Sequence, residues 1–577
     1  MSLRELDRSE TSEPVAAGGA PERRRGGESP GDPRWWRTAV IYEIYPRSFA
    51  DGNGDGTGDL AGIRARLPYL HALGVDAIWF TPWYVSPLAD GGYDVADYRA
   101  IDPAFGTLAD AEALIAEARA LGLRTIVDVV PNHVSDRHPW FQAALAAGPG
   151  SPERQRFWFH PGRDGDSAAM PTAWTSSFAG PTWTRTTNPD GSPGEWYLHL
   201  FAAEQPDLNW NHPDVRREFE DVIAFWFDRG AAGIRIDSAA LLVKDPALPE
   251  VPVEPAAGEH PNTDRDELHE IYRSWRVVAD RYPDPKALIG ELWVPDLERF
   301  ARYLRPDELH TAFNFDFLTR PWDASELRAS IDLTLTAHAP IDAPATWLLS
   351  NHDVTRPVTR FGRDETSFAF KAKRRGTRTD LDLGTRRARA AALLVAALPG
   401  SLYIYQGDEL GLDEVEDLPD ERRQDPMFYR SEGVDPGRDG CRVPLPWSGT
   451  EPPFGFSAGS AAVEPWLPQP ARWSALTVEA QASDPRSMLS LYRRSLAIRA
   501  ADPDLQGASF TWLATDSSAL AFLRGDRFVS ITNFGPAMAA GPSGGELLQA
   551  SVDLVEGALP PDATGWWRLP PPREGGR

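Results

Sequence analysis

LADAEALIAEARALGLRTIVDVV, residues 108–130, joins a helical pattern to a short apolar run. Apolar residues recur at helical spacing over 108–122, whereas RTIVDVV (124–130) is rich in Val and Ile with little alternation. An apolar run without alternation is typical of a parallel strand that is buried on both faces. The stretch therefore predicts one helix–strand unit of an α/β fold.

Comparable apolar runs recur along the chain, with helical stretches between them. They lie at 39–49, 76–83, 232–237, 287–293, 311–317, 345–351 and 401–407. Together with 124–130 they provide the eight strands of a (β/α)₈ TIM barrel. The fold class predicted is therefore α/β, with a barrel as its main body.

The remaining segments differ in composition from the barrel. Residues 1–33 are polar and predict a disordered tail. Between the barrel parts at 34–133 and 206–504, residues 134–205 are rich in Trp, Pro and Gly and predict an inserted domain after the third strand. Short strand-like pieces over 505–571 predict a C-terminal β-sandwich.

The charge of the chain limits its partners. Lys and Arg total 59 against 84 Asp and Glu, a formal charge of -25 over 577 residues. Such a surface repels nucleic acid and anionic membranes, so neither is expected as a partner. The chain is compatible with a monomer or a homodimer.

The apolar segments and the cysteine content of the chain bear on where in the cell the protein is found. The first residues contain no apolar core of a secretory signal, and the longest apolar run, 390–405, contains Pro399 and Gly400 and is too short to span a bilayer. With Cys441 as its single cysteine, the chain has no internal disulfide. These features favour a cytoplasmic location.

Charged and polar residues gather where the predicted strands end. They are His133, Arg235, Asp237, Glu291, His352 and Asp353. In a barrel of parallel strands these ends meet at one mouth, which is where such folds place their active sites. Each acidic residue alone could be a helix cap or a salt-bridge partner, but so much charge at one face is costly without a function.

Cleavage of a glycosidic bond needs these groups. One carboxylate attacks the anomeric carbon and a second carboxyl group donates a proton to the leaving oxygen. Arg235 lies two residues before Asp237 on the same strand face, so it is expected to hold Asp237 ionised as the nucleophile. Glu291 stands beside Leu292 and Trp293, and an apolar surrounding suits an acid catalyst.

The segments DVVPNH (128–133), GIRIDSA (233–239), GELW (290–293) and SNHD (350–353) resemble the four signature segments of the α-amylase family, glycoside hydrolase family 13. The resemblance extends from Trp35 to about residue 570. It implies that Asp237 is the nucleophile, Glu291 the acid/base and Asp353 the stabiliser of the transition state. It also implies that His133, Arg235 and His352 bind the first glucose.

Further segments resemble the branch of the family that contains α-glucosidases and oligo-1,6-glucosidases. They are QPDLNW (205–210), NFDF (314–317), GGYDVADY (91–98) and GRDGCRVPLPW (437–447). The resemblance implies that Arg438 pairs with Asp94 at the floor of a closed glucose pocket, so that only a terminal glucose enters. Phe178 is expected against the bound sugar, with plain packing as an equal alternative.

An acidic loop, DGNGDGTGD (51–59), predicts a structural cation. Asp51, Asn53, Asp55 and Asp59 alternate along it, with the carbonyl of Thr57 among them, and oxygen ligands suit Ca²⁺ or Mg²⁺. An EF-hand is rejected because Gly62 stands where its bidentate Glu would be. The resemblance implies one bound cation, while a polar turn without an ion is the alternative.

The predicted activity is that of an exo-acting, retaining α-glucosidase that acts on short oligosaccharides by double displacement. Relatives commonly carry Val just after the nucleophile, whereas Ser238 and Ala239 stand here, which favours α-1,4 bonds as in maltose. The departure from Val also leaves α-1,2, α-1,3 or sucrose-type substrates open. A glucosyltransferase and a sucrose- or isomaltose-acting enzyme are the nearest alternatives. A non-catalytic binding subunit is disfavoured by the retained Asp237, Glu291 and Asp353.

Overall fold

Eight parallel strands form the centre of the structure, a computed structural model that describes residues 34–188, 190–370, 372–458, 463–516 and 518–571. The prediction for 1–33 lies outside the described residues. The strands are β1 (Val40–Ile44), β2 (Ala77–Phe80), β5 (Arg124–Val129), β9 (Gly233–Ile236), β10 (Ala287–Gly290), β11 (Thr311–Ala312), β12 (Thr346–Trp347) and β13 (Ser401–Tyr405). All eight predicted strands are confirmed, and each is shorter than predicted because its carboxyl end continues into a loop or a short helix.

The sheet curls into a nearly closed barrel. Its strand order is β11-β10-β9-β5-β2-β1-β13-β12, and all its pairings are parallel. The two outer strands meet through the hydroxyls of Thr311 and Thr346, which lie 2.5 Å apart. The barrel prediction is therefore confirmed.

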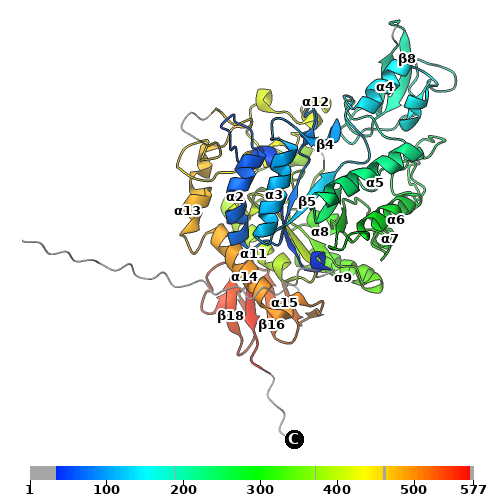
Figure 1. Cartoon of the computed structure of the whole chain (residues 1–577). Helices are drawn as coiled ribbons and strands as arrows, with labels where there is room; N and C mark the ends of the chain where they lie inside the picture. The colour runs from blue at the N-terminus through cyan, green and yellow to red at the C-terminus, as the bar shows by residue number, and fades with distance from the viewer. Residues whose placement is uncertain (1–33, 189, 371, 459–462, 517, 572–577) are drawn as a thin grey trace, which may run out of the picture.

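Helices surround the barrel (Figure 1). The longer ones are α2 (Leu60–Leu73), α3 (Leu108–Ala120), α5 (Pro213–Asp228), α6 (Leu268–Ala279), α9 (Ala324–His338), α11 (Leu381–Ala397) and α14 (Met488–Ala501). The helix predicted over 108–122 is α3, and it begins at a capping box in which Thr107 and Asp110 bond each other's backbone amides.

Residues that point into the barrel change from apolar to charged along the strands. The apolar layer contains Ile41, Trp79, Ile126, Ile289 and Tyr403. Glu43, Asp128 and Glu291 each follow one of these positions by two residues, so they point the same way one layer higher. The alternation of strand side chains thus carries a buried charged layer to the mouth of the barrel.

The inserted segment folds on its own small core. It contains α4 (Pro139–Ala147) and a three-stranded antiparallel sheet of β6 (Phe159–His160), β7 (Trp183–Thr187) and β8 (Pro193–Leu198). An isolated bridge between His133 and Asp207 joins the two ends of the segment. In Figure 1 the segment (cyan) and the C-terminal strands (red) lie at opposite ends of the molecule.

The C-terminal region is all β. A five-stranded antiparallel sheet, β14-β15-β16-β20-β18, accompanies a two-stranded ribbon of β17 (Ala539–Ala540) and β19 (Ala558–Leu559). The five strands are β14 (Thr511–Trp512), β15 (Ala519–Arg524), β16 (Phe528–Asn533), β18 (Glu546–Ala550) and β20 (Ala563–Arg568). The sequence patterns did not reveal β20, whose alternation is interrupted at Gly565.

The C-terminal sheet packs on the barrel through α11. The indole nitrogen of the fully buried Trp566 donates to the carbonyl of Leu393 at 3.2 Å. None of the helices in the described part of the chain combines the length and the hydropathy that a bilayer crossing needs.

Candidate active site

A cavity of about 280 Å³ opens at the carboxyl ends of the barrel strands. Most of the side chains predicted to be catalytic or substrate-binding line it: His133, Phe178, Asp237, Glu291, His352, Asp353 and Arg438. Arg235 lies directly beneath these groups, since it bonds two of them. Asp94 does not line the cavity. The structure therefore brings all but one of the predicted residues to one place.

Arg235 joins the acidic groups of the cavity floor. Its Nη1 donates to Asp237 Oδ1 at 2.7 Å and to both carboxylate oxygens of Asp128 at 3.1 Å, while its Nη2 donates to Glu291 Oε2 at 2.8 Å. The guanidinium lies over the ring of Trp79, 5.0 Å from its centroid, and the side chain is 1% exposed. One buried cation thus fixes the predicted nucleophile and the predicted acid relative to each other.

Burial raises the pKa of both carboxyl groups. Burial raises the pKa of Glu291 to about 7, with the guanidinium of Arg235 opposing the shift and the charge of Asp237 adding to it. The pKa of Asp237 is also raised by burial, because the opposing effects of Arg235 and of the Ser238 hydroxyl are smaller. Arg235 thus favours the ionised form of Asp237, as expected, but burial outweighs its effect. The buried surrounding expected for Glu291 is present.

Asp353 is held as an anion on the opposite side of the cavity. Its Oδ1 accepts from Arg442 at 2.8 Å and from Arg438 at 3.3 Å, and it lies 3.4 Å from His352 Nε2. Burial by itself would raise the pKa of Asp353, but His352, Arg438 and Arg442 together hold it well below its usual range. The surroundings of this carboxylate therefore favour its ionised form.

Both predicted histidines are buried and neutral. Burial lowers the pKa of His133 to about 4 and that of His352 well below its usual range. His352 Nδ1 shares a hydrogen bond with Glu43, and its ring stacks on Tyr93 at 5.3 Å. His133 Nε2 lies 3.0 Å from the amide nitrogen of Gln205. Neutral imidazoles with fixed rings are suited to bonding sugar hydroxyls.

The predicted pair of Arg438 and Asp94 is wrong, because Asp90 takes the place of Asp94. Arg438 Nη2 donates to Asp90 Oδ1 at 2.5 Å, and its Nε donates to Asp425 at 2.6 Å. Asp94 instead accepts the backbone amides of Ala89 and Asp90, both at 3.0 Å. The chain makes a tight turn at Gly91, where φ is +59°. This turn directs the carboxylate of Asp90 to the cavity and that of Asp94 back into its own loop.

Phe178 lies where it was predicted. It lines the cavity, its ring meets Phe201 edge to face at 5.2 Å, and Arg438 lies over it at 4.8 Å from the centroid. With 6% of the residue exposed, Phe178 is packed in place, and its contact with a sugar stays a prediction.

The geometry agrees with the comparison to known proteins. The family model described as "Alpha amylase, catalytic domain" matches residues 43–507. The chain belongs to the α-amylase family. It is a glycoside hydrolase, and the strand ends that carry its carboxyl groups are those of the family's catalytic domain.

Relatives in the α-amylase family share most of their length with this chain. A probable α-glucosidase of Rhizobium meliloti is 38% identical, covering 85% of this chain and 87% of the relative. The trehalose-6-phosphate hydrolase of Escherichia coli is 37% identical, covering 85% and 88%. An oligo-1,6-glucosidase of Parageobacillus thermoglucosidasius is 33% identical, covering 87% and 90%. The predicted branch of the family is therefore confirmed.

A solved structure supports the fold in the same way. The crystal structure of an α-glucosyl transfer enzyme, XgtA, superposes with a TM-score of 0.81 at 34% identity, covering 93% of this chain and all of that one. The barrel and the C-terminal strands thus follow the architecture of this α-amylase family member.

The acidic loop at 51–59 is closed by its own backbone. Asp51 accepts the amides of Asn53, Gly54 and Gly56, and Asp59 accepts those of Gly52, Asn53 and Gly62. Over the described ranges, no three His, Cys, Asp or Glu side chains are grouped as a metal site requires. The cation therefore stays a prediction based on the resemblance.

Sequence reasoning missed several residues of the site. They are Glu43, Asp90, Asp128, Gln205 and Arg442, of which the last four stood inside or beside segments that had been singled out. Their roles depend on partners far away in sequence, such as Asp353 for Arg442. For Asp128 the signal was its place in DVVPNH (128–133), and the structure shows that it faces Arg235 in the register of two paired strands.

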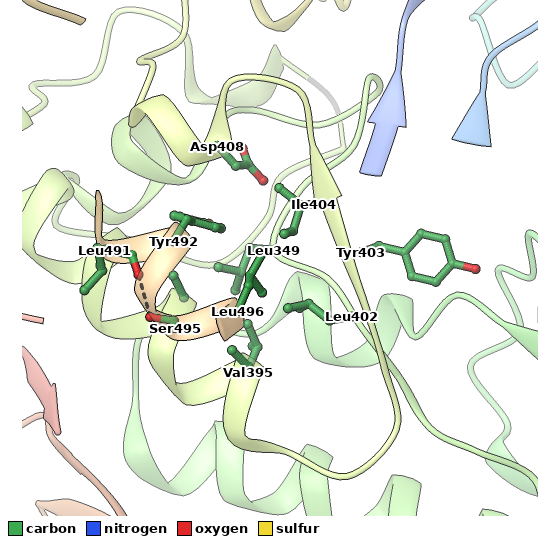
Figure 2. Close-up of a pocket in the computed structure, with 12 residues that line it drawn as sticks. Leu349, Val395, Leu402, Tyr403, Ile404, Asp408, Leu491, Tyr492, Ser495 and Leu496 are labelled. Carbon is green, nitrogen blue, oxygen red and sulfur yellow. Dashed lines mark hydrogen bonds between the residues drawn. The ribbon is translucent and has the colours of Figure 1, made fainter. Parts of the chain in front are cut away.

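A second, much smaller cavity lies behind the barrel wall (Figure 2). It measures about 10 Å³ and is lined by apolar side chains such as Val395, Leu402 and Leu496, with Asp408 at one end. Burial raises the pKa of Asp408 to about 6, and its Oδ2 accepts the hydroxyl of Ser350 at 2.6 Å. This volume holds no more than a single water, so the space is no ligand site.

The assignment of Asp90 rather than Asp94 to the floor of the cavity can be tested by replacing each of the two residues in turn. In Asp90→Asn the Arg438 guanidinium loses a buried anionic partner, and we expect kcat/KM for α-glucosides to fall about 10- to 150-fold. The thermal midpoint should change little, because Asp425 still holds Arg438. Steady-state kinetics and thermal unfolding measure the two effects.

Asp94→Asn is the matched control for this exchange. Because Asp94 closes its own loop, we expect a loss of stability of about 1 kcal/mol and a smaller loss of kcat/KM than at Asp90. A larger kinetic loss at Asp94 with unchanged stability would contradict the assignment of the floor to Asp90.

Proposed function

We propose that the protein is an exo-acting, retaining α-glucosidase that removes terminal glucose from short oligosaccharides, with α-1,4 bonds as its preferred linkage. The proposal rests on one observation above all, the two nitrogens of Arg235 that bond Asp237 and Glu291 at 2.7 and 2.8 Å. One guanidinium that joins both carboxyl groups indicates the short spacing of retaining enzymes, about 5–5.5 Å, rather than the wider spacing of inverting ones.

In the first step Asp237 attacks the anomeric carbon and Glu291 protonates the leaving oxygen. Glu291 Oε2 already accepts from Arg235 and from the backbone amide of Ser238, at 2.8 and 2.9 Å. The proton therefore belongs on Oε1, beside the indole of Trp293. In the second step a water loses its proton to the Glu291 carboxylate and releases glucose from the covalent ester.

Exo action is supported by the closed end of the cavity. Asp90, Arg438 and Asp425 form a buried ionic chain across the floor, and Gln205 donates to Asp90 at 3.0 Å. A glucose at this end is enclosed on its far side by paired charges, so a longer chain cannot extend through it. Charged groups of this kind bond sugar hydroxyls in a site that excludes water.

The preference for α-1,4 bonds rests on Ser238. It lines the cavity directly after Asp237, and its hydroxyl donates to Asp237 Oδ2 at 2.9 Å. A small residue at this position leaves room beside the nucleophile for the second sugar of maltose. Glucose release from maltose should then exceed that from isomaltose, which parallel assays by product chromatography would measure.

Loss of the nucleophile is the direct test of the proposal. We expect Asp237→Asn to lower kcat on 4-nitrophenyl α-glucoside by at least about 1,000-fold while the thermal midpoint is kept, because the amide cannot form the ester. The control is Asp280→Asn, a carboxylate 61% exposed at the end of α6. Full activity in Asp237→Asn would reject the mechanism, and a wild type inactive on every α-glucoside would favour a non-catalytic binding subunit.

The expected pH dependence of kcat/KM follows from the raised pKa of Glu291. Because its pKa is raised to about 7 and only the protonated group can act as an acid, kcat/KM should fall as the pH rises above this value. The expected slope is about tenfold per pH unit.

α-Glucosyl fluoride serves as the control for the pH experiment, since fluoride leaves without a proton. Its kcat/KM should show a much weaker decline above pH 7 than that of maltose. Identical profiles for both substrates would show that another group titrates.

We also propose that the loop at 51–59 binds one structural cation through Asp51, Asn53, Asp55, Thr57 and Asp59. The carboxylates of Asp51 and Asp59 both lie 3.1 Å from the amide nitrogen of Asn53, and the charge of Asp51 adds to burial in raising the pKa of Asp59. A cation would offset this repulsion. The cation would lie in the loop and would supply no step of the reaction.

Chelation tests the cation. We expect dialysis against EDTA to lower the thermal midpoint, and Ca²⁺ or Mg²⁺ at one hundred times its Kd to restore about 2.7 kcal/mol. Asp55→Ala, which alters an exposed ligand, should lose this response. An unchanged midpoint after chelation of the wild type would favour a polar turn without an ion.

A further inference from the structure

Glu43 is an acidic group of the site that the double displacement does not use. It belongs to β1, is 2% exposed, and bonds Nδ1 of His352 through its Oε1. Asp237, Glu291 and Asp353 each bond at least one arginine. For Glu43, no Lys or Arg nitrogen of the described chain lies within 4.0 Å of the carboxyl group. Glu43 is therefore a buried carboxyl group without a directly bonded guanidinium or ammonium group.

The ring of His352 presents one nitrogen to a carboxylate. Its Nε2 lies 3.4 Å from Asp353 Oδ1, and both side chains line the cavity. Arg442 donates to the same Oδ1 at 2.8 Å, which favours the ionised form of this carboxyl group. A bare Nε2 would turn its lone pair toward the anion, and stacking on Tyr93 at 5.3 Å holds the ring in place. The arrangement therefore requires a hydrogen on Nε2.

The other nitrogen of His352 has to accept a hydrogen bond. Arg442 Nε donates to the carbonyl oxygen of His352 at 2.8 Å, and a guanidinium this close disfavours a charged imidazole. Burial is the main cause that lowers the pKa of His352 well below its usual range. A neutral imidazole carries one hydrogen, so with that hydrogen on Nε2 the Nδ1 atom offers a lone pair. The partner of Nδ1 is Glu43, whose carboxyl group must then be protonated and act as the donor.

The surroundings of Glu43 agree with a protonated carboxyl group. Burial raises the pKa of Glu43 well above its usual range, and the charges of Asp353 and Asp408 add to this shift. Arg235 opposes the shift, but its effect is smaller than that of burial. On the adjacent strand Tyr405 pairs with Glu43 in register, and burial keeps the Tyr405 hydroxyl uncharged by raising its pKa well above the usual range. The side chains around Glu43 thus leave the effect of burial uncompensated.

We propose that Glu43 is a positioning residue: it stays protonated, donates a hydrogen bond to Nδ1 of His352, and thereby fixes the hydrogen of His352 on Nε2. That hydrogen is then available to a hydroxyl group of the glucose bound in the cavity. The inference rests on the proposed α-glucosidase function and adds a residue that orients a contact with the substrate. Glu43 keeps its proton throughout the cycle, so no step of the double displacement passes through it.

The kinetics of two variants test the donor role. Glu43→Gln keeps a donor, since its amide nitrogen can bond Nδ1, and we expect kcat/KM on maltose to stay within about threefold of the wild type with an unchanged pH profile. Glu43→Leu has a similar size and no donor, so we expect kcat/KM to fall about 10- to 100-fold. Glu298→Gln, at a side chain 87% exposed, is the control and should match the wild type. Thermal unfolding shows that each variant is folded.

Infrared spectroscopy tests the proton itself and does not depend on activity. Glu43→Gln removes one carboxyl group, so the difference between its spectrum and that of the wild type isolates the signal of Glu43. At a pH above the pKa of Glu291, we expect the wild type to show the C=O stretching band of a carboxylic acid. A carboxylate band in its place would overturn the proposal. This measurement also decides the question where Glu43→Leu does not fold.

The outcomes separate the two proposals. A Glu43→Gln variant as slow as Glu43→Leu overturns the role of Glu43 while the α-glucosidase function stands, and so does a folded Glu43→Leu variant as fast as the wild type. A wild type that releases glucose from no α-glucoside overturns the proposed function, and the role of Glu43 in the reaction with it.

Discussion

The guanidinium of Arg235 is the constraint on which the rest of the site depends. Three carboxyl groups, from Asp128, Asp237 and Glu291, meet this one cation in a largely buried layer at the floor of the cavity. Without it, like charges at this distance would repel each other and take up protons. With it, burial can raise the pKa of Glu291 to about 7 while the pair keeps its geometry. Structure and acid catalysis therefore depend on the same ion cluster.

The barrel supplies this cluster through the simple alternation of its strands. Apolar residues such as Ile126 and Ile289 fill the interior, and two residues later Asp128 and Glu291 point in the same direction. Parallel pairing then aligns the layers, as when Asp128 faces Arg235 in register. The charge is placed at the end of a packed core, where the cost of its burial is offset by pairing rather than by solvent.

The two ends of the cavity are lined by different kinds of side chain. The floor is ionic, with Arg438 bonded to Asp90, Asp353 and Asp425, and it suits a ring that carries many hydroxyls. The mouth is aromatic, with Phe370 partly uncovered beside Trp293. The two ends of the cavity thus differ in chemical character.

The sequence by itself determined the eight strands, the barrel, and the meeting of Asp237, Glu291 and Asp353. It could do so because apolar runs mark strands, and parallel strands bring their carboxyl ends to one mouth. Only the tertiary structure decided between Asp90 and Asp94 as the partner of Arg438, and only it revealed Glu43, Arg442 and Phe370 at the site. These contacts join segments up to 348 residues apart through turns and side-chain directions, which no local pattern of residues encodes.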